Sequence, residues 1–229
     1  MTQVPATATP LTRDATAAML VPAYVEVFGE MPDQQRAELL LALIWIENAN
    51  GQSFIQRNWG NLATKPSAGV DYWRPSWFDL AQVEAMPDSP KKARLLDLHA
   101  RMLAGKAPEA FRAFATHGDG LRAWLRLLKS PGMKPVLDAA SSGDAVAFAH
   151  AIFSSRYCPD PECRAAGPSY ARTRDLIHAA GYFDGLKKKS AEVGPDLGLS
   201  FFFLGRQLAA RTCGKKLGDV GAPNGIGDA

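Results

Sequence analysis

The sequence predicts a mainly α-helical domain with an irregular aromatic segment, followed by a separate C-terminal extension. Helical spacing of apolar residues recurs over most of residues 12–180, and Leu39–Ile46 forms an apolar run too hydrophobic for a surface helix. The composition then changes at Lys187–Lys189 and becomes Gly-rich over residues 218–229. With 229 residues, 47% of them hydrophobic and 21% charged, the chain is long enough for one domain with a tail, or at most two small domains.

The first helices are read from their capping residues. Residues 1–11 are rich in Pro, Thr and Ala and are expected to form a flexible arm. Thr12 caps a first helix, and Pro22 inside it predicts a kink or a split. Asp33 starts a second helix that contains the apolar run and ends at Glu47.

Glu47 is the first candidate functional residue. It lies at the end of a buried helix, just before Asn48-Ala49-Asn50-Gly51, where Asn and Gly favour the left-handed conformation that ends helices. Partial burial raises the pKa of a carboxyl group, which suits a general acid near neutral pH. The alternative is a helix-terminal Glu that reaches water.

Residues 64–84 have no helical period and combine four aromatic residues, Tyr72, Trp73, Trp77 and Phe78, with two prolines. Such a cluster forms either core packing under a long loop or a wall on which sugar rings stack. The acidic residues of this segment are Asp71, Asp79 and Glu84.

Further helices are expected at residues 91–104, 121–128, 133–140, 144–155 and 170–180. The turn and cap before the helix at 121–128 are assigned to Gly118-Asp119-Gly120.

Composition excludes several classes of site. A net charge of +3, without a basic face interleaved with aromatics, argues against nucleic-acid binding, although it suits an anionic cell wall. Three cysteines do not make a zinc site. Cys158 and Cys163 are expected to be reduced in the cytoplasm, with a disulfide forming after release.

The N-terminus lacks the basic and apolar regions of a secretory signal, and the most apolar later run, Leu197–Leu204, is far too short for a transmembrane segment. We therefore expect synthesis in the cytoplasm without a signal peptide, followed by action on the cell wall during phage lysis, from a virion, or through a secretion device.

Three segments occur in an order known from one enzyme family. Glu47 with the loop Asn58-Trp59-Gly60-Asn61-Leu62 comes first, the segment from Phe111 to Leu128 second, and Tyr157-Cys158-Pro159-Asp160-Pro161 with Tyr170 third. Together they resemble the glucosaminidase-type branch of the lysozyme-like superfamily, which contains peptidoglycan hydrolases. The chain departs from the family's Tyr-Ala-Thr-Asp-Pro-x-Tyr signature at Cys158 and Pro159, and it carries extra residues 162–169.

The resemblance implies a two-lobed fold over residues 12–185, with the cleft between the helical bulk and the aromatic segment. It implies cleavage of the β-1,4 glycan backbone of peptidoglycan after N-acetylglucosamine, with Glu47 as proton donor and Tyr157 beside it. Acid catalysis on an acetal needs no metal or organic cofactor, and none is expected. The second carboxylate is assigned to Asp71, with substrate assistance and a transglycosylase mechanism left open. The expected substrate-binding residues are Asn58, Trp59, Asn61, Tyr72, Trp73, Phe111 and Tyr170.

The extension, residues 186–229, lies outside that resemblance. Its Phe201-Phe202-Phe203 run cannot face one core stripe on a helix, and basic residues follow it. Residues 190–229 are therefore interpreted as a docking element for a phage tail or virion protein. For the function of the whole chain, two alternatives stay open. One is a muramidase or lytic transglycosylase on the same fold, and the other is a non-catalytic virion protein with that fold.

Overall fold

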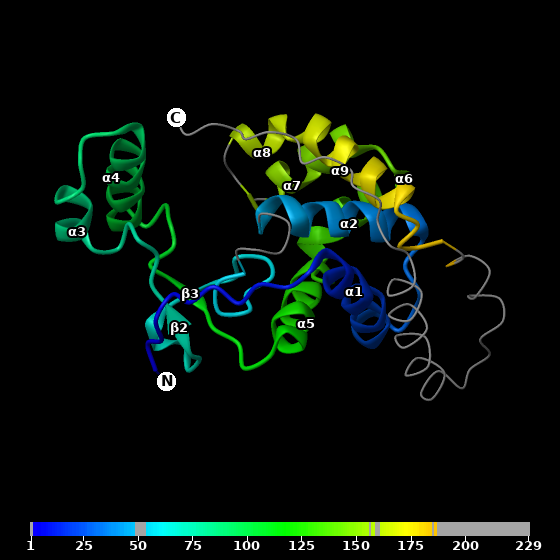
Figure 1. Cartoon of the computed structure of the whole chain (residues 1–229), viewed down its shortest axis with the longest axis horizontal. Helices are drawn as coiled ribbons and strands as arrows, with labels where there is room; N and C mark the ends of the chain where they lie inside the picture. Colours follow the sequence, from blue (N-terminus) through cyan, green and yellow to red (C-terminus); the bar gives the residue numbers. More distant parts are fainter. Residues whose placement is uncertain (1, 49–53, 156, 159–160, 185, 187–229) are drawn as a thin grey trace.

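The structure is a computed structural model that describes residues 2–48, 54–155, 157–158, 161–184 and 186. This part of the chain is mainly α-helical with one small antiparallel sheet, and it divides into a larger helical lobe and a smaller mixed lobe (Figure 1). The predicted fold class is confirmed. Except for Leu186, the predicted extension lies outside the described residues, and its docking role stays a prediction. Among the described helices, none has the length and apolar character needed to cross a membrane.

The larger lobe is built around one buried helix, α2 (Gln34–Glu47). In Figure 1 this helix runs through the middle of the lobe, with the later helices on one side and the pair α1–α5 on the other. It packs against α9, α6 and α1. The remaining helices of the lobe are α1 (Arg13–Phe28), α5 (His117–Leu128), α6 (Lys134–Ser142), α7 (Ala145–Ser154), α8 (Pro161–Ala165) and α9 (Gly167–Ala179).

Burial explains why α2 lacks a polar face. Every residue from Leu39 to Trp45 is at most 3% exposed. Each large aliphatic side chain buried in this way contributes about 1.5–3 kcal/mol. The helix begins at Asp33, whose carboxylate accepts a hydrogen bond from the Arg36 amide at 2.8 Å. At its other end, Asn48 is not in the left-handed region, since its φ is −115°. The other residues expected to supply that conformation, Asn50 and Gly51, lie outside the described residues.

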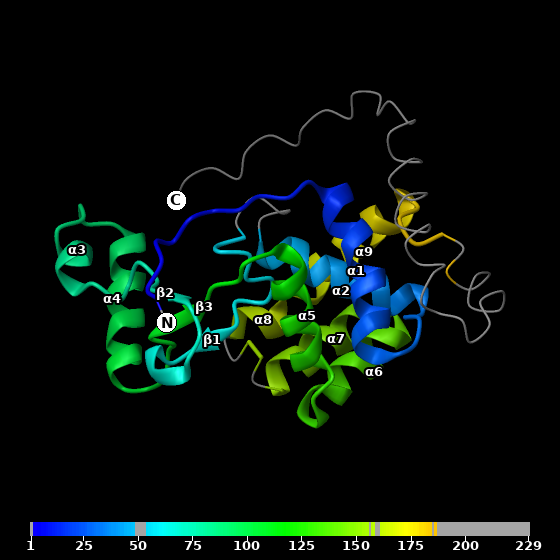
Figure 2. The same cartoon turned by 90° about the horizontal axis from the view of Figure 1, so that it is seen from below.

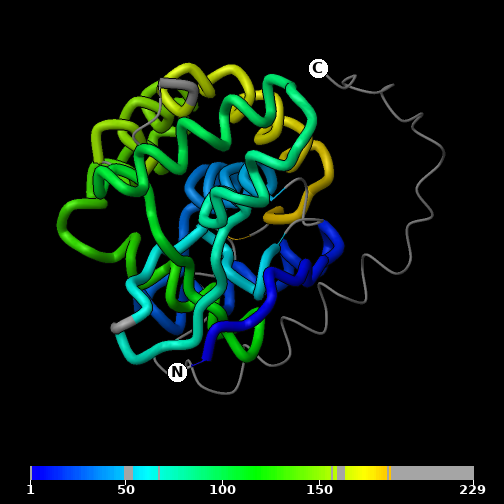
Figure 3. The backbone as a smooth tube through the Cα atoms, turned by 90° about the vertical axis from the view of Figure 1, so that its left-hand side faces the viewer, coloured from blue at the N-terminus to red at the C-terminus, as the bar shows by residue number. Residues whose placement is uncertain are grey.

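The smaller lobe contains β1 (Ala63–Thr64), β2 (Tyr72–Trp73) and β3 (Ala110–Arg112), with β3 in the centre of the sheet. Phe111 pairs with Ala63 on one side and with Trp73 on the other. The lobe also carries α3 (Leu80–Glu84) and α4 (Pro90–Leu103). Figures 1 and 3 show the α3–α4 pair beyond the C-terminal end of α2, which is the end that carries Glu47.

Most bounds of the predicted helices agree with the structure, but α1 and α5 differ in detail, and the short helices α3 and α8 form where no helix was predicted. Helix α1 is continuous across Pro22, so the split that was one of the two alternatives there does not occur. Helix α5 is capped by Thr116, whose hydroxyl accepts a hydrogen bond from the Asp119 amide at 3.1 Å. Gly118 and Gly120 therefore lie inside its first turn rather than forming its cap.

The N-terminal arm is held in place, contrary to the expected flexible segment. Residues 2–4 pair with Asp71 and Tyr72, and residues 7–9 pair with residues 54–57. Thr9 makes three of these bonds: its amide and hydroxyl donate to the Phe54 carbonyl at 2.7 and 2.8 Å, and its hydroxyl accepts from the Arg57 amide at 3.0 Å. The arm thus runs along both lobes before it enters α1 (Figure 2).

Cys158 and Cys163 are joined by a disulfide. This is the bridge that was considered for the protein after release, and it connects the segment of Tyr157 to α8.

Deleting residues 2–9 should lower the free energy of unfolding by about 2 kcal/mol or more, because several backbone hydrogen bonds of about 0.5–1.5 kcal/mol each are lost. Urea denaturation followed by circular dichroism measures this. Within the arm, Thr9→Val should lower the free energy of unfolding. The matched control is Thr7→Val, because Thr7 is exposed and its hydroxyl has no hydrogen-bond partner among the described residues. An unchanged urea midpoint in the deletion would mean that the arm does not stabilise the two lobes.

Candidate active site

Glu47 is the last residue of α2, and its side chain is only partly exposed. Burial raises the pKa of this carboxyl group to about 8, while a hydrogen bond from Tyr157 acts in the opposite direction. The group therefore carries its proton at neutral pH. Such a carboxylic acid can donate a proton to a substrate atom.

Tyr157 connects Glu47 to two other segments. Its hydroxyl oxygen lies 3.2 Å from Glu47 Oε2 and 3.3 Å from the carbonyl oxygen of Gly60, and it accepts a hydrogen bond from Trp124 Nε1 at 2.8 Å. Burial, followed by the charge of Glu47, raises the pKa of Tyr157 well above its usual value. The phenol is therefore a neutral donor beside the carboxyl group.

Two buried amides anchor the loop that follows Glu47. The Asn48 side chain donates to the carbonyls of Ile44 and Trp59, at 3.0 and 3.1 Å. The Asn58 side chain donates to the carbonyls of Leu62 and Arg112 at 3.1 Å and accepts from the Leu62 amide at 2.8 Å. Asn58 is 1% exposed with all its polar atoms engaged, so it orders the loop instead of contacting a sugar.

Gly60 is required by the close approach of three segments. A Cβ atom at this position would collide with the Trp124 ring and would lie 2.6 Å from the Tyr157 hydroxyl oxygen. Any larger residue would displace the Trp124 ring and the Tyr157 hydroxyl, and the hydroxyl is the group that contacts Glu47. The glycine therefore allows the loop carbonyl to reach Tyr157.

Several predicted sugar-stacking residues lie in the core. Trp59 is 0% exposed and packs on Phe54 and His117. Trp73 and Phe111 are 8% and 7% exposed and stack on each other at 4.8 Å. For Trp73 the packing alternative is therefore correct. Trp59 and Phe111, which were predicted to bind substrate, are buried in the same way.

The other predicted binding residues have different surroundings. Asn61 is exposed in the left-handed region with φ 47°, next to Gly60, and Tyr72 is partly exposed in β2. Tyr170 is 3% exposed and meets Phe148 edge to face. Its pKa is raised by burial and by the charge of Glu47, so it lies within electrostatic reach of the carboxyl group.

Asp71 has no contact with Glu47 in the structure. It is exposed, and its carboxylate accepts a hydrogen bond from the Thr2 amide at 2.9 Å, while Asp79 caps α3. Residues 48–70 contain no Asp or Glu, so Asp71 is the first acid after Glu47 in the chain. Within the described residues, no carboxylate contributes to the pKa of Glu47, and no cluster of three His, Cys, Asp or Glu residues could hold a metal.

Trp124, Asn48 and Gly60 support the site but were not predicted as site residues. Apolar spacing places Trp124 on the buried face of α5, yet its hydrogen-bond partner lies 33 residues further along the chain. Periodicity alone does not reveal such a contact.

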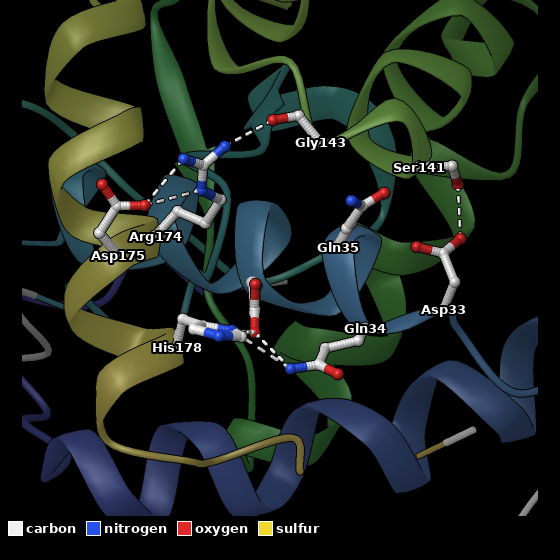
Figure 4. Close-up of a pocket in the computed structure, with 9 residues that line it drawn as sticks. Asp33, Gln34, Gln35, Ser141, Gly143, Arg174, Asp175 and His178 are labelled. Atoms are coloured by element: carbon white, nitrogen blue, oxygen red, sulfur yellow. Dashed lines mark hydrogen bonds and ion pairs between the residues drawn. The ribbon is translucent and has the colours of Figure 1, made fainter. Parts of the chain in front are cut away.

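A separate polar cavity of about 720 Å³ lies near the opposite end of α2, between α2, α6 and α9 (Figure 4). Its polar groups bind one another: His178 Nδ1 lies 2.8 Å from a Glu38 carboxylate oxygen, and Ser141 donates to Asp33 at 2.7 Å. Arg174 bonds the Gly143 carbonyl and Asp175. These contacts tie the three helices together.

Comparison with known proteins gives limited results. No family model and no curated protein matches the chain. Among solved structures, it is similar to the crystal structure of a peptidoglycan hydrolase from Sphingomonas sp. A1, with 18% sequence identity and a TM-score of 0.44. The match covers 80% of this chain and 99% of the other.

Replacing Glu47 with Gln should stabilise the protein at neutral pH. Between pH 4.5, the usual pKa of Glu, and about 8, the folded state keeps a proton that the unfolded state loses, so wild-type stability falls as the pH rises. Glu47→Gln has no such proton to lose, so its free energy of unfolding at pH 7 should exceed that of the wild type by up to about 3 kcal/mol.

Chemical denaturation at pH 4.5 and pH 7.5 tests this expectation, with the exposed Glu84→Gln as the control. The difference in the free energy of unfolding between wild type and Glu47→Gln should increase as the pH rises. A constant difference at both pH values would contradict a raised pKa at Glu47.

Proposed function

We propose that the chain is a peptidoglycan hydrolase that cleaves the β-1,4 glycan backbone by general acid catalysis from Glu47. The observation that carries the proposal is the partly buried Glu47 carboxyl group, which is protonated near neutral pH and lies beside the Tyr157 hydroxyl. Glycosidic bonds break when an acid protonates the leaving oxygen. The substrate class is supported by the three segments that resemble glucosaminidase-type enzymes.

In this proposal Glu47 gives its proton to the glycosidic oxygen as the bond to the sugar carbon breaks. The Tyr157 hydroxyl then donates to the new carboxylate, which lowers the cost of the negative charge. Asn61 and Tyr72, which are accessible, are the candidates for contacting the sugars on either side of the broken bond.

The bond proposed for cleavage is the one after N-acetylglucosamine. A second candidate activity, that of a lytic transglycosylase, is favoured by the absence of a carboxylate contact at Glu47 among the described residues. A hydrolase with two carboxylates needs the second one about 5–9.5 Å from the first. In a transglycosylase a hydroxyl group of the substrate replaces water, and no second carboxylate is required.

The proposed setting is a phage or virion-associated enzyme whose residues 190–229 dock it to a particle. This setting rests on the sequence of the extension, with its Phe run and its basic residues. The rival proposal, a virion protein that binds glycan without cutting it, predicts no product from purified peptidoglycan.

Glu47→Gln should lower the rate of peptidoglycan cleavage by at least about 10²-fold, since it keeps the shape of the side chain and removes the acidic proton. The wild-type rate should fall as the pH rises through about 8, because Glu47 then loses its proton. Turbidity loss of purified peptidoglycan measures both effects. A truncation after Lys189 is the control and should keep the wild-type rate while losing attachment to any carrier particle.

Mass spectrometry of the muropeptides identifies the reaction. Reducing-end N-acetylglucosamine is expected, reducing-end N-acetylmuramic acid would indicate a muramidase, and 1,6-anhydro ends would indicate a transglycosylase. Asp71→Asn separates the mechanisms further, because this substitution lowers the cleavage rate only if Asp71 takes part in the reaction. Full activity of Glu47→Gln would refute the proposed function.

A further inference from the structure

Trp124 differs from the other four tryptophans of the chain in the use of its indole N–H. The indole nitrogens of Trp45, Trp59, Trp73 and Trp77 are buried and have no hydrogen-bond partner among the described residues. Trp124 is 0% exposed, and its N–H donates to the Tyr157 hydroxyl oxygen at 2.8 Å. This hydrogen bond is the shortest of the contacts at Tyr157.

The Tyr157 hydroxyl has one proton and two acceptors at nearly equal distances. Glu47 Oε2 lies at 3.2 Å and the Gly60 carbonyl oxygen at 3.3 Å. Because a phenol can donate only one conventional hydrogen bond, it bonds one acceptor at a time. The Trp124 N–H occupies a lone pair on the oxygen and leaves the proton free to turn toward either acceptor.

The loop at Gly60, the Trp124 ring and the Tyr157 hydroxyl are packed too closely for the Tyr157 oxygen to change position. A Cβ at Gly60 would collide with the Trp124 ring and crowd the Tyr157 hydroxyl, so loop, indole and phenol are packed in direct contact. The oxygen is therefore fixed in position, while the O–H bond can rotate.

We propose that Trp124 is a positioning residue: its indole N–H holds the Tyr157 oxygen between Glu47 and the Gly60 carbonyl, so that the hydroxyl bonds Gly60 while Glu47 is protonated and bonds Glu47 once it is ionised. This inference rests on the proposed function, because it concerns the same acid.

The proton balance is simple. When the glycosidic C–O bond breaks, its electron pair goes to the oxygen, and that oxygen receives the Glu47 proton. The Tyr157 O–H then turns from the Gly60 carbonyl to the Glu47 carboxylate and keeps its own proton. Donation from Trp124 makes the phenol a stronger donor, since hydrogen bonds in a chain polarise one another. Among the described residues, the titratable groups coupled to Glu47 are Tyr157 and Tyr170.

A double-mutant cycle tests the role of Trp124. Trp124→Phe should lower kcat about tenfold with little change in KM, and it should move the alkaline limb of the pH–rate profile to higher pH, because the bond that lowers the pKa of Glu47 is weakened. In the Tyr157→Phe background the same substitution should have almost no further effect on kcat. Trp45→Phe, which removes a buried indole N–H without a partner, is the matched control and should keep the wild-type pH profile.

An equal loss of kcat from Trp124→Phe in both backgrounds would overturn the proposal, since it would show a packing effect independent of Tyr157. If Glu47→Gln abolishes cleavage while Trp124→Phe leaves the pH profile unchanged, this inference fails and the proposed function stands. If Glu47→Gln is fully active, the proposed function fails.

A second measurement uses the wild-type protein and Tyr157→Phe, and it needs neither activity nor a stable Trp124 variant. The indole N–H resonance of Trp124, followed by NMR, should shift with the same pH midpoint as the Glu47 carboxyl group, and this shift should disappear in Tyr157→Phe. A Trp124 resonance that does not move while Glu47 titrates in the wild type would contradict the proposed coupling.

Discussion

The placement of a carboxyl group at the end of a buried helix is the constraint on which the site depends. Helix α2 is enclosed by α1, α6 and α9, so its last residue emerges where the packed lobe ends. Glu47 is only partly exposed to water there, and this burial favours the neutral form of its carboxyl group. The loop at Gly60, Trp124 in α5 and Tyr157 after α7 all meet at this point.

The partly buried Glu47 lowers the stability of the folded protein at neutral pH, and the apolar burial of α2 compensates for this. Keeping an acid partly buried opposes folding at neutral pH, whereas the seven residues from Leu39 to Trp45 are almost fully buried and stabilise the same helix. Asn48 and Asn58 add fixed hydrogen bonds on both sides of the loop. The N-terminal arm adds a further connection, because it bonds residues 54–57 in the loop and Tyr72 in the small lobe.

The sequence predicts those features that depend on local spacing. The bounds of α2, its cap at Asp33 and the acid at its end follow from the apolar run and the residues that flank it. Burial of Trp59, Trp73 and Phe111 could not be decided in the same way, since an aromatic ring suits both a core and a sugar-binding wall. The partners of Trp124 and of Thr9 lie 33 and 45 or more residues away in the chain, and only the tertiary fold brings them together. The role of Asp71 as a second carboxylate stays a prediction. In the structure Asp71 lies in the other lobe, where its carboxylate accepts a hydrogen bond from the arm.

The central claim is that the fold keeps Glu47 protonated at neutral pH, and direct titration of its carboxyl carbon by NMR tests it most closely. Carbon-13 labelling of Glu side chains, with the Glu47 signal identified by its loss in Glu47→Gln, gives the midpoint. We expect a midpoint near pH 8. A midpoint near 4.5, the usual value for Glu, would show that the carboxyl group is ionised at neutral pH and would contradict its assignment as the acid.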